Sequence, residues 1–121
     1  VAYSYMVKLA SEAAELLSKE GINVEIIDPR TLVPLDIDAI VASVSKTRRA
    51  LVVHESWQRG GYGAEIAATI GERCFGSLKS PVQRLAAKNV PIPFSPPLEE
   101  FVLPSVDAIA ASARSVVKGD A

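Results

Sequence analysis

Short apolar runs alternate along this chain with segments whose apolar residues recur at helical spacing, and this alternation restricts its fold more than any other feature. Residues 24–27 and 51–53 are largely apolar runs, and residues 82–86 form a further candidate strand that begins after a proline. Each run is too short for a helix. Short, continuous apolar strands are typical of a mainly parallel sheet that helices cover on both faces. The sequence therefore predicts an α/β fold.

Four segments carry the i, i+3, i+4 pattern of helices with one buried face. They span residues 6–17, 37–44, 63–75 and 106–117. Ser4 and Asp36 are candidate N-caps for the first two helices, and Gly21 and Gly119 are placed to end the first and the last. With residues 1–3 taken as the end of a strand, strands and helices alternate along most of the chain, and no domain boundary is visible.

A proline-rich segment interrupts this alternation at residues 89–97, which contain Pro91, Pro93, Pro96 and Pro97. Proline lacks the backbone N–H that helices and central strands need for hydrogen bonding. We therefore expect the segment to be neither a helix nor a central strand, but a rigid strap on the surface.

Charge and composition exclude two classes of partner. The chain has 13 basic and 14 acidic residues, a formal net charge of −1 and no block of like charge. We expect no binding to nucleic acid or to an anionic membrane, because both depend on concentrated Lys and Arg. No apolar run approaches the roughly 20 residues that cross a bilayer. The 121 residues, of which 49% are hydrophobic, suit one domain over residues 1–121.

The single cysteine, Cys74, lies in an apolar helical pattern. We expect it to be a small buried hydrophobic residue rather than a reactive thiol. It cannot form an internal disulfide, and no Cys/His cluster is present to bind a metal. A reducing compartment therefore suits the chain best.

His54 is the only histidine, and it follows a predicted strand beside Glu55. A general base is one interpretation. However, neighbours on a strand point to opposite faces, so Glu55 is poorly placed to orient His54. No nucleophile or second histidine completes a catalytic set. A hydrogen-bonded histidine at a strand end or an interface is the favoured interpretation.

The glycine-rich sequence from Gly60 to Gly63 lies between a predicted strand and a predicted helix, where a phosphate-binding turn would lie. The G-x-G-x-x-G spacing is incomplete, because Ile66 stands where the third glycine would be. A tight turn with positive φ angles is the simpler interpretation.

Two further residues suggest contacts rather than catalysis. Arg30 can bind a carboxylate or phosphate, or form an ion pair with Asp28 or Asp36, and we favour the ion pair. Trp57 beside the glycine-rich turn is a candidate interface anchor, although it could equally fold onto its own domain. In open α/β sheets the functional groups lie beyond the carboxyl ends of the strands. The predicted interface residues are therefore Arg30, His54, Glu55, Trp57, Gly60, Gly61 and Tyr62; we predict no catalytic, cofactor-binding or metal-binding residue.

Several blocks of this sequence resemble the transketolase C-terminal domain as it occurs in beta subunits of thiamine-diphosphate-dependent 2-oxo acid dehydrogenases. Residues 28–36, DPRTLVPLD, resemble its R-T-L-x-P-L-D segment, and residues 51–66 are similar to its V-V-x-E and G-G-x-G-A-E-I blocks. Residues 81–104 resemble its P-V-x-R and P-x-P tail. The blocks occur in order and cover nearly the whole chain from Tyr3.

The resemblance implies a three-layer α/β/α domain whose mainly parallel sheet has about five strands, one of them an antiparallel edge strand. It implies that the chain is part of a longer beta subunit. The parent enzyme would decarboxylate a 2-oxo acid, or cleave acetoin, with thiamine diphosphate and Mg²⁺ held elsewhere. Implied partners are an alpha subunit, a second beta subunit and the subunit-binding domain of an acyltransferase. The implied compartment is bacterial cytoplasm or mitochondrial matrix.

Two positions depart from the family pattern. His54 and Lys79 stand where many relatives have acidic residues, and Lys79 bears on docking because the partner's docking domain is usually basic. Two other interpretations stay open: a free-standing nucleotide- or flavin-binding domain, and the C-terminal domain of another transketolase-like enzyme.

Overall fold

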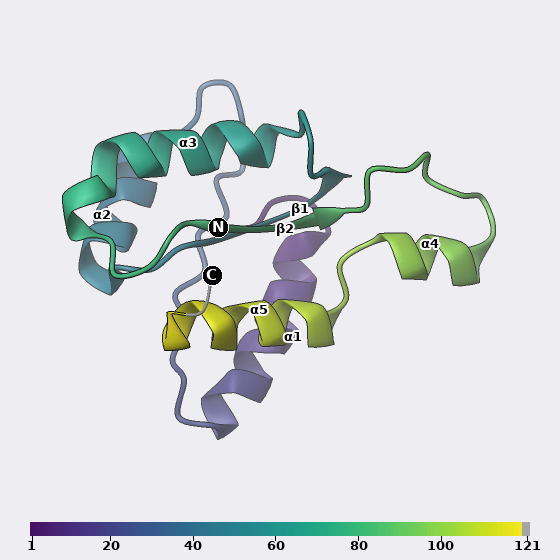
Figure 1. The fold of residues 1–121 in the computed structure, drawn as a ribbon, viewed down its shortest axis with the longest axis horizontal. Helices are drawn as coiled ribbons and strands as arrows, with labels where there is room; N and C mark the ends of the chain where they lie inside the picture. Colours follow the sequence, from purple (N-terminus) through teal and green to yellow (C-terminus); the bar gives the residue numbers. More distant parts are fainter. Residues whose placement is uncertain (120–121) are drawn as a thin grey trace.

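The computed structural model describes residues 1–119 as an α/β domain (Figure 1). The elements in chain order are α1 (Met6–Lys19), α2 (Ile37–Thr47), β1 (Leu51–Trp57), α3 (Tyr62–Cys74), the 3₁₀ turn η1 (Phe75–Ser77), β2 (Gln83–Ala87), α4 (Pro96–Val102) and α5 (Val106–Lys118). The four predicted helices are therefore present, as are the strands that begin near residues 51 and 82.

The sheet contains β1 and β2, which pair in parallel with Leu51 opposite Gln83 and an irregularity between Val53 and Trp57. The expectation of about five strands is wrong for residues 1–119, where the regular sheet has two strands, and no antiparallel edge strand is present among them. Residues 1–3 lie beside β1 but form only one isolated parallel bridge, between Ala2 and Val53.

The predicted strand at residues 24–27 is also absent from the regular sheet. One backbone hydrogen bond links this segment to residues 1–3: the Ala2 N–H donates to the Ile27 carbonyl at 3.0 Å. Val24 is 44% exposed, although its sequence pattern favours burial. A strand needs a continuous neighbour to hydrogen-bond with, and two residues of chain beside it do not supply one.

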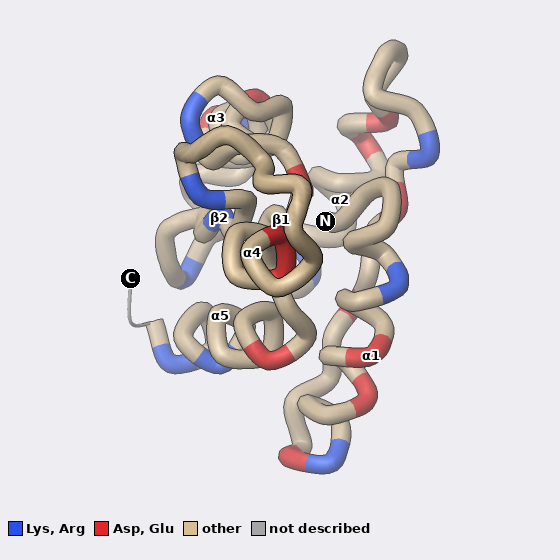
Figure 2. The backbone as a smooth tube through the Cα atoms, turned by 90° about the vertical axis from the view of Figure 1, so that its right-hand side faces the viewer, with Lys and Arg blue, Asp and Glu red and all other residues tan. Residues whose placement is uncertain are grey.

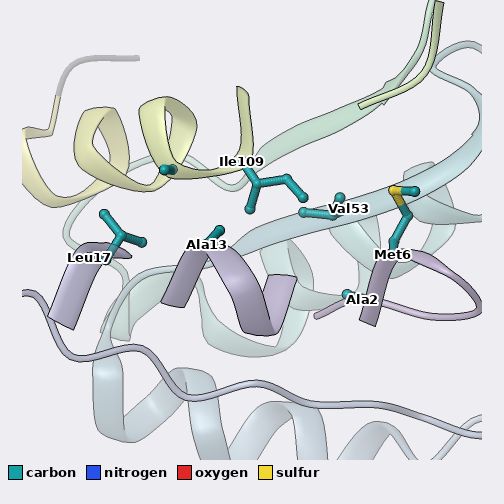
Figure 3. Packing of buried hydrophobic residues seen from close by; sticks show 7 residues of the cluster. Ala2, Met6, Ala13, Leu17, Val53 and Ile109 are labelled. Carbon is teal, nitrogen blue, oxygen red and sulfur yellow. The ribbon is translucent and has the colours of Figure 1, made fainter. Parts of the chain in front are cut away.

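Helices cover both faces of the sheet. On one face, α1 and α5 pack together over Val53; on the other, α2 and α3 pack over Val52. Consecutive residues of a strand point to opposite faces, so these two valines anchor two separate cores. Figure 3 shows Met6, Ala13 and Leu17 of α1 facing Val53 and Ile109 in the first core. The predicted buried cysteine, Cys74, lies in the second core.

The helix ends confirm some of the predicted caps and contradict one. The Asp36 carboxylate accepts from the Ala39 N–H at 3.1 Å and caps α2, and Gly119 ends α5 with a φ of 81°. Ser4 does not cap α1, whose N-cap is Tyr5 without a side-chain hydrogen bond. Gly21 follows the end of α1 with a φ of 78°, a conformation that glycine adopts without strain.

The proline segment differs from its prediction at one end. Pro96 and Pro97 are the first two residues of α4, whereas we expected no helix there. Proline is well suited to the first turn of a helix, where the N–H groups have no partner within the helix. The prolines therefore start a short helix instead of excluding one.

Charges of both signs are spread over the surface. Figure 2 shows acidic and basic positions interspersed along α1. Within residues 1–119, no helix is long and apolar enough to cross a membrane.

Candidate interface at the carboxyl end of β1

The carboxyl end of β1 and the start of α3 meet around His54. The side chain of His54 has no exposed surface, and its Nδ1 lies 2.7 Å from the Ser56 hydroxyl. Its ring stacks on Tyr3 with centroids 5.9 Å apart and planes 7° from parallel. The structure therefore places this predicted interface residue inside the domain, where it joins the N-terminal segment to β1 and α3.

Two glycines make room for the His54 ring. A Cβ atom at Gly63 would lie 2.1 Å from His54 Cδ2, and one at Gly61 would lie 2.3 Å from the Trp57 carbonyl oxygen. Only Gly60, with a φ of 74°, has the positive φ that we predicted for this turn. Close packing, rather than turn geometry, therefore requires glycine at positions 61 and 63.

The surroundings of His54 favour its neutral form. Burial lowers the pKa of His54 below its usual value, and the positive charge of Arg84 lowers it further. Burial also raises the pKa of the Tyr3 phenol. Within the described part of the chain, His54 Nε2 and the Tyr3 hydroxyl have no hydrogen-bond partner. The imidazole is therefore enclosed by its own domain, in surroundings that favour its neutral form.

Trp57 lies partly on the surface and is fixed by one polar contact. Its side chain is 51% exposed, and its indole N–H donates to the Val90 carbonyl at 2.8 Å. Trp57 is thus both bound to its own domain and available to a partner.

The other two predicted interface residues nearby also contact their own domain. The Tyr62 hydroxyl donates to the Leu32 carbonyl at 2.8 Å, and Glu55 is partly buried.

Arg30 forms the predicted ion pair, and its partner is Asp28. The guanidinium lies 3.0 Å from the Asp28 carboxylate, on a backbone with a φ of 58°. The other predicted partner, Asp36, caps α2 instead. The side chain of Arg30 is 84% exposed, so solvent weakens the pair and leaves the guanidinium open to a second anion.

We predict that Arg30→Ala changes the free energy of unfolding by less than about 0.5 kcal/mol, because an exposed ion pair contributes little. Urea denaturation of the 121-residue chain measures this. Arginine and alanine bear similar strain at a φ of 58°, so Arg30→Ala tests the charge, whereas Arg30→Gly also removes the charge and should be slightly more stable because glycine relieves the strain. A loss above about 2 kcal/mol in both variants would contradict a peripheral role for this pair.

Sequence reasoning missed a set of exposed apolar side chains around the strap. Five large apolar residues of the strap and α4 are exposed, as is Trp57. We call these six residues the strap surface: Trp57, Val90, Ile92, Phe94, Leu98 and Phe101. Phe94 is fully exposed and Phe101 is 68% exposed. The Lys88 ammonium lies 3.2 Å from the centre of the Phe101 ring. The signal was available, because apolar residues separate the prolines that we interpreted only as structure breakers.

The residues near α3 do not fit a thiamine diphosphate–Mg²⁺ site. The space above Gly61 and Gly63 at the start of α3 is filled by His54 and Ser56, so a diphosphate has no room there. Residues 1–119 contain no group of three His, Cys, Asp or Glu side chains that could hold a metal ion.

Comparisons with known proteins agree on one family. Residues 1–109 match the model of the transketolase C-terminal domain. The chain is 44% identical over 119 residues to the beta subunit of acetoin:2,6-dichlorophenolindophenol oxidoreductase from Cupriavidus necator, covering 98% of this chain and 35% of that protein. It is 45% identical over 113 residues to a mitochondrial pyruvate dehydrogenase E1 component subunit beta-2 from Oryza sativa, covering 93% and 30%. The chain thus spans about a third of these relatives.

A solved structure shows the same fold. The split-gene transketolase, an inactive beta4 tetramer, superposes with a TM-score of 0.77 and 23% sequence identity, covering 99% of this chain and 38% of that one. At this identity the likeness establishes the fold alone.

Proposed function

The chain belongs to the transketolase C-terminal domain family, and from that premise we propose that it is the assembly domain of the beta subunit in a 2-oxo acid dehydrogenase E1 component. Of two relatives that match over more than nine-tenths of this chain, one is named as the beta subunit of an acetoin oxidoreductase and the other as a beta subunit of a pyruvate dehydrogenase E1 component. The chain spans only about a third of each. The parent enzyme would act on pyruvate, a branched-chain 2-oxo acid or acetoin.

The strap surface is the observation that carries this proposal. The end of β1, the strap and α4 lie on the same side of the molecule (Figure 1), and each has large apolar side chains that are exposed, Phe94 fully so. Contiguous exposed apolar surface is uncommon on monomeric proteins and marks protein–protein contacts. Trp57, which is 51% exposed, is of the residue type that most often dominates the energy of such contacts.

The catalytic cofactor is assigned to other parts of the parent enzyme. We propose that thiamine diphosphate and Mg²⁺ bind between the alpha subunit and the rest of the beta subunit, since the residues at the start of α3 leave no room for a diphosphate. When bound, the cofactor supplies the carbanion chemistry that decarboxylation requires. This domain would support that site by holding the subunits together.

Proposed partners are the alpha subunit, a second beta subunit and the subunit-binding domain of an acyltransferase. The relatives named above include a mitochondrial protein and one from Cupriavidus necator, so we propose the mitochondrial matrix or bacterial cytoplasm as the compartment. Lys79 is exposed near the end of α3, and a basic docking partner would avoid it.

We expect that Trp57→Ala with Phe94→Ser, made in the complete beta subunit, weakens assembly about tenfold or more, because aromatic anchors supply much of the energy of an interface. Sedimentation velocity of the mixed subunits measures assembly. The control is Phe75→Ser. It makes the same change as Phe94→Ser at a side chain that is 85% exposed in η1, away from the strap surface.

The same variants in the 121-residue chain separate assembly from folding. Phe94 is fully exposed and Trp57 makes one hydrogen bond, so we expect a melting temperature within about 5 °C of the parent. Unchanged assembly in the double variant, or an equal loss with Phe75→Ser, would refute the proposed role of the strap surface.

A further inference from the structure

A groove of about 720 Å³ lies between α3 and the segment that leads into β2. The residues of α3 that line it are small: Ala64, Ala67, Ala68 and Gly71. A Cβ atom added at Gly71 would meet nothing within 4 Å, and Phe75, just after α3, is 85% exposed. The rest of the lining comes from residues 78–82 and Arg84. The groove is therefore open, mostly apolar and bounded by two different elements.

The groove lies on the side of α3 that faces away from α2. Figure 1 shows α2 and α3 over the same face of the sheet, and the Arg73 guanidinium joins them through the Asp38 carboxylate at 3.0 Å. Arg73 lies about half a turn around α3 from Gly71, which lines the groove. Within residues 1–119, β2 pairs only with β1 and so forms an edge of the sheet. A further helix beside α3 would extend this layer over β2, as helices do in α/β folds.

Both charged residues that line the groove are basic. They are Lys79 and Arg84, and no Asp or Glu is among the lining residues. In the described part of the chain neither cation forms an ion pair. Lys79 is exposed, and Arg84 donates to the neutral Gln58 carbonyl at 2.7 Å. The groove therefore combines an apolar lining with two positive charges that no carboxylate of this domain balances.

We propose that this groove binds an amphipathic helix of a partner protein, with carboxylates of that helix facing Lys79 and Arg84. The apolar side of the helix would cover Phe75 and Val82, and the small side chains of α3 would let the two helices approach closely. The Cα atoms of Lys79 and Arg84 are at most about 18 Å apart, because five residues of chain separate them. A helix of about three turns spans that distance. Complementary charge would select this partner over a basic one.

Negative charge on α3 favours a helix with acidic residues on one flank only. Glu65 and Glu72 are exposed on α3, and neither lines the groove. They are seven residues apart, so they lie on the same side of the helix. A partner helix would direct its carboxylates toward Lys79 and Arg84 and away from these two glutamates. A nucleic acid, which is negative along its whole length, would meet both signs of charge and is disfavoured.

The groove and the strap surface share no residue, so the two proposals fail independently. Lys79→Glu should weaken binding in the groove and leave subunit assembly unchanged. Trp57→Ala with Phe94→Ser should have the opposite pair of effects.

Two matched peptides test the preference for acidic partners by NMR titration of the isotope-labelled 121-residue chain. The acidic probe is a helical peptide of about four turns with leucines on one face and glutamates along one flank; lysines replace the glutamates in the basic probe. We expect the acidic peptide to bind about tenfold or more tightly than the basic one, with amide shifts at Ala68, Gly71 and Lys79. High salt should narrow this difference. Equal affinities, no binding of the acidic peptide, or shifts at the strap surface instead would overturn the proposal.

Charge reversal at one residue tests whether the groove itself sets this preference. Lys79→Glu should weaken binding of the acidic peptide about tenfold and strengthen binding of the basic one. The matched control is Lys19→Glu, which makes the same change at an exposed residue of α1, on the other face of the sheet. It should leave both affinities within about twofold, since distant exposed charges are screened. Equal effects of the two variants would mean that net charge alone selects the peptide, and the proposal would fail.

A further variant closes the groove without disturbing the fold. Gly71→Leu places a side chain in the open space beside Gly71 and replaces glycine by a residue that favours helix formation. We expect it to weaken binding of the acidic peptide about tenfold or more while the free energy of unfolding does not fall. Unchanged binding in this variant would show that the peptide binds elsewhere.

Discussion

Gly63→Ala should destabilise the domain by about 3 kcal/mol, enough to lower its melting temperature by roughly 10 °C. The alanine Cβ would lie 2.1 Å from Cδ2 and 2.2 Å from Nε2 of His54. The ring cannot move away easily, because it is fully buried and stacks on Tyr3. Either α3 must shift from β1 or the ring must leave its position, and both lose packing in the core.

The helix itself supplies the control. Gly71 also lies in α3, but a Cβ there would meet nothing within 4 Å. Gly71→Ala should therefore stabilise the domain by about 0.5–1 kcal/mol, because alanine favours the helix. Urea denaturation of both variants gives the comparison. Equal stabilities for the two would show that the contact between β1 and α3 is looser than described.

A double variant identifies the clash as the cause. His54→Ala alone should destabilise the domain by leaving a cavity. Combined with Gly63→Ala it should cost less than the sum of the two single changes, since removal of the ring removes the clash. Additive losses would mean that the two residues act independently.

The helices were predictable because their signals are local. The apolar spacing and the caps of α2 and α5 depend on residues within a few positions of one another, and Asp36 acts as its sequence context indicates. The strands depend on neighbours that are distant in sequence. Residues 24–27 have the composition of a strand, yet their only backbone link to the N-terminal segment is the Ala2–Ile27 hydrogen bond.

The candidate site stays a prediction, and the structure changes how its residues are understood. The sequence predicts it at the end of β1 and in the following glycines. It could not show that His54 fills the space above Gly61 and Gly63, because that contact is formed by two elements whose packing no local pattern encodes. Phe94 was overlooked for a similar reason: exposure of an apolar residue is a property of the whole fold.

In a 121-residue chain prepared with a free amine at Val1, stability should depend on pH between pH 8 and 6. Burial lowers the pKa of the Val1 amine from 8.0 to about 6. Between these values the unfolded chain binds a proton that the folded chain excludes, so stability rises with pH. The contribution is complete above pH 8 and is lost as the pH falls to about 6. The difference between these two pKa values corresponds to about 3 kcal/mol in the free energy of unfolding.

Urea denaturation at pH 8.5, 7 and 6 measures this loss, and acetylation of the Val1 amine provides the control. The acetylated chain carries no proton there and should keep its stability down to about pH 6.5. Below that value the lowered pKa of His54 reduces stability in both forms, because protons then favour the unfolded chain. His54→Gln in the acetylated chain separates this second effect. If the free energy of unfolding fell equally between pH 8 and 7 with and without the acetyl group, the Val1 amine would not be the cause of the loss.

The origin of this pH dependence is the place of the amine in the sheet. The Val1 nitrogen donates to the Leu51 carbonyl from a position where the sheet needs only an uncharged N–H. The nearby Glu25 carboxylate is paired with Lys46 and does not compensate a charge on the amine. An acetamide at the same nitrogen keeps the hydrogen bond and has no proton to lose. Acetylation should therefore abolish the pH dependence above pH 6.5 without lowering the stability at pH 8.5.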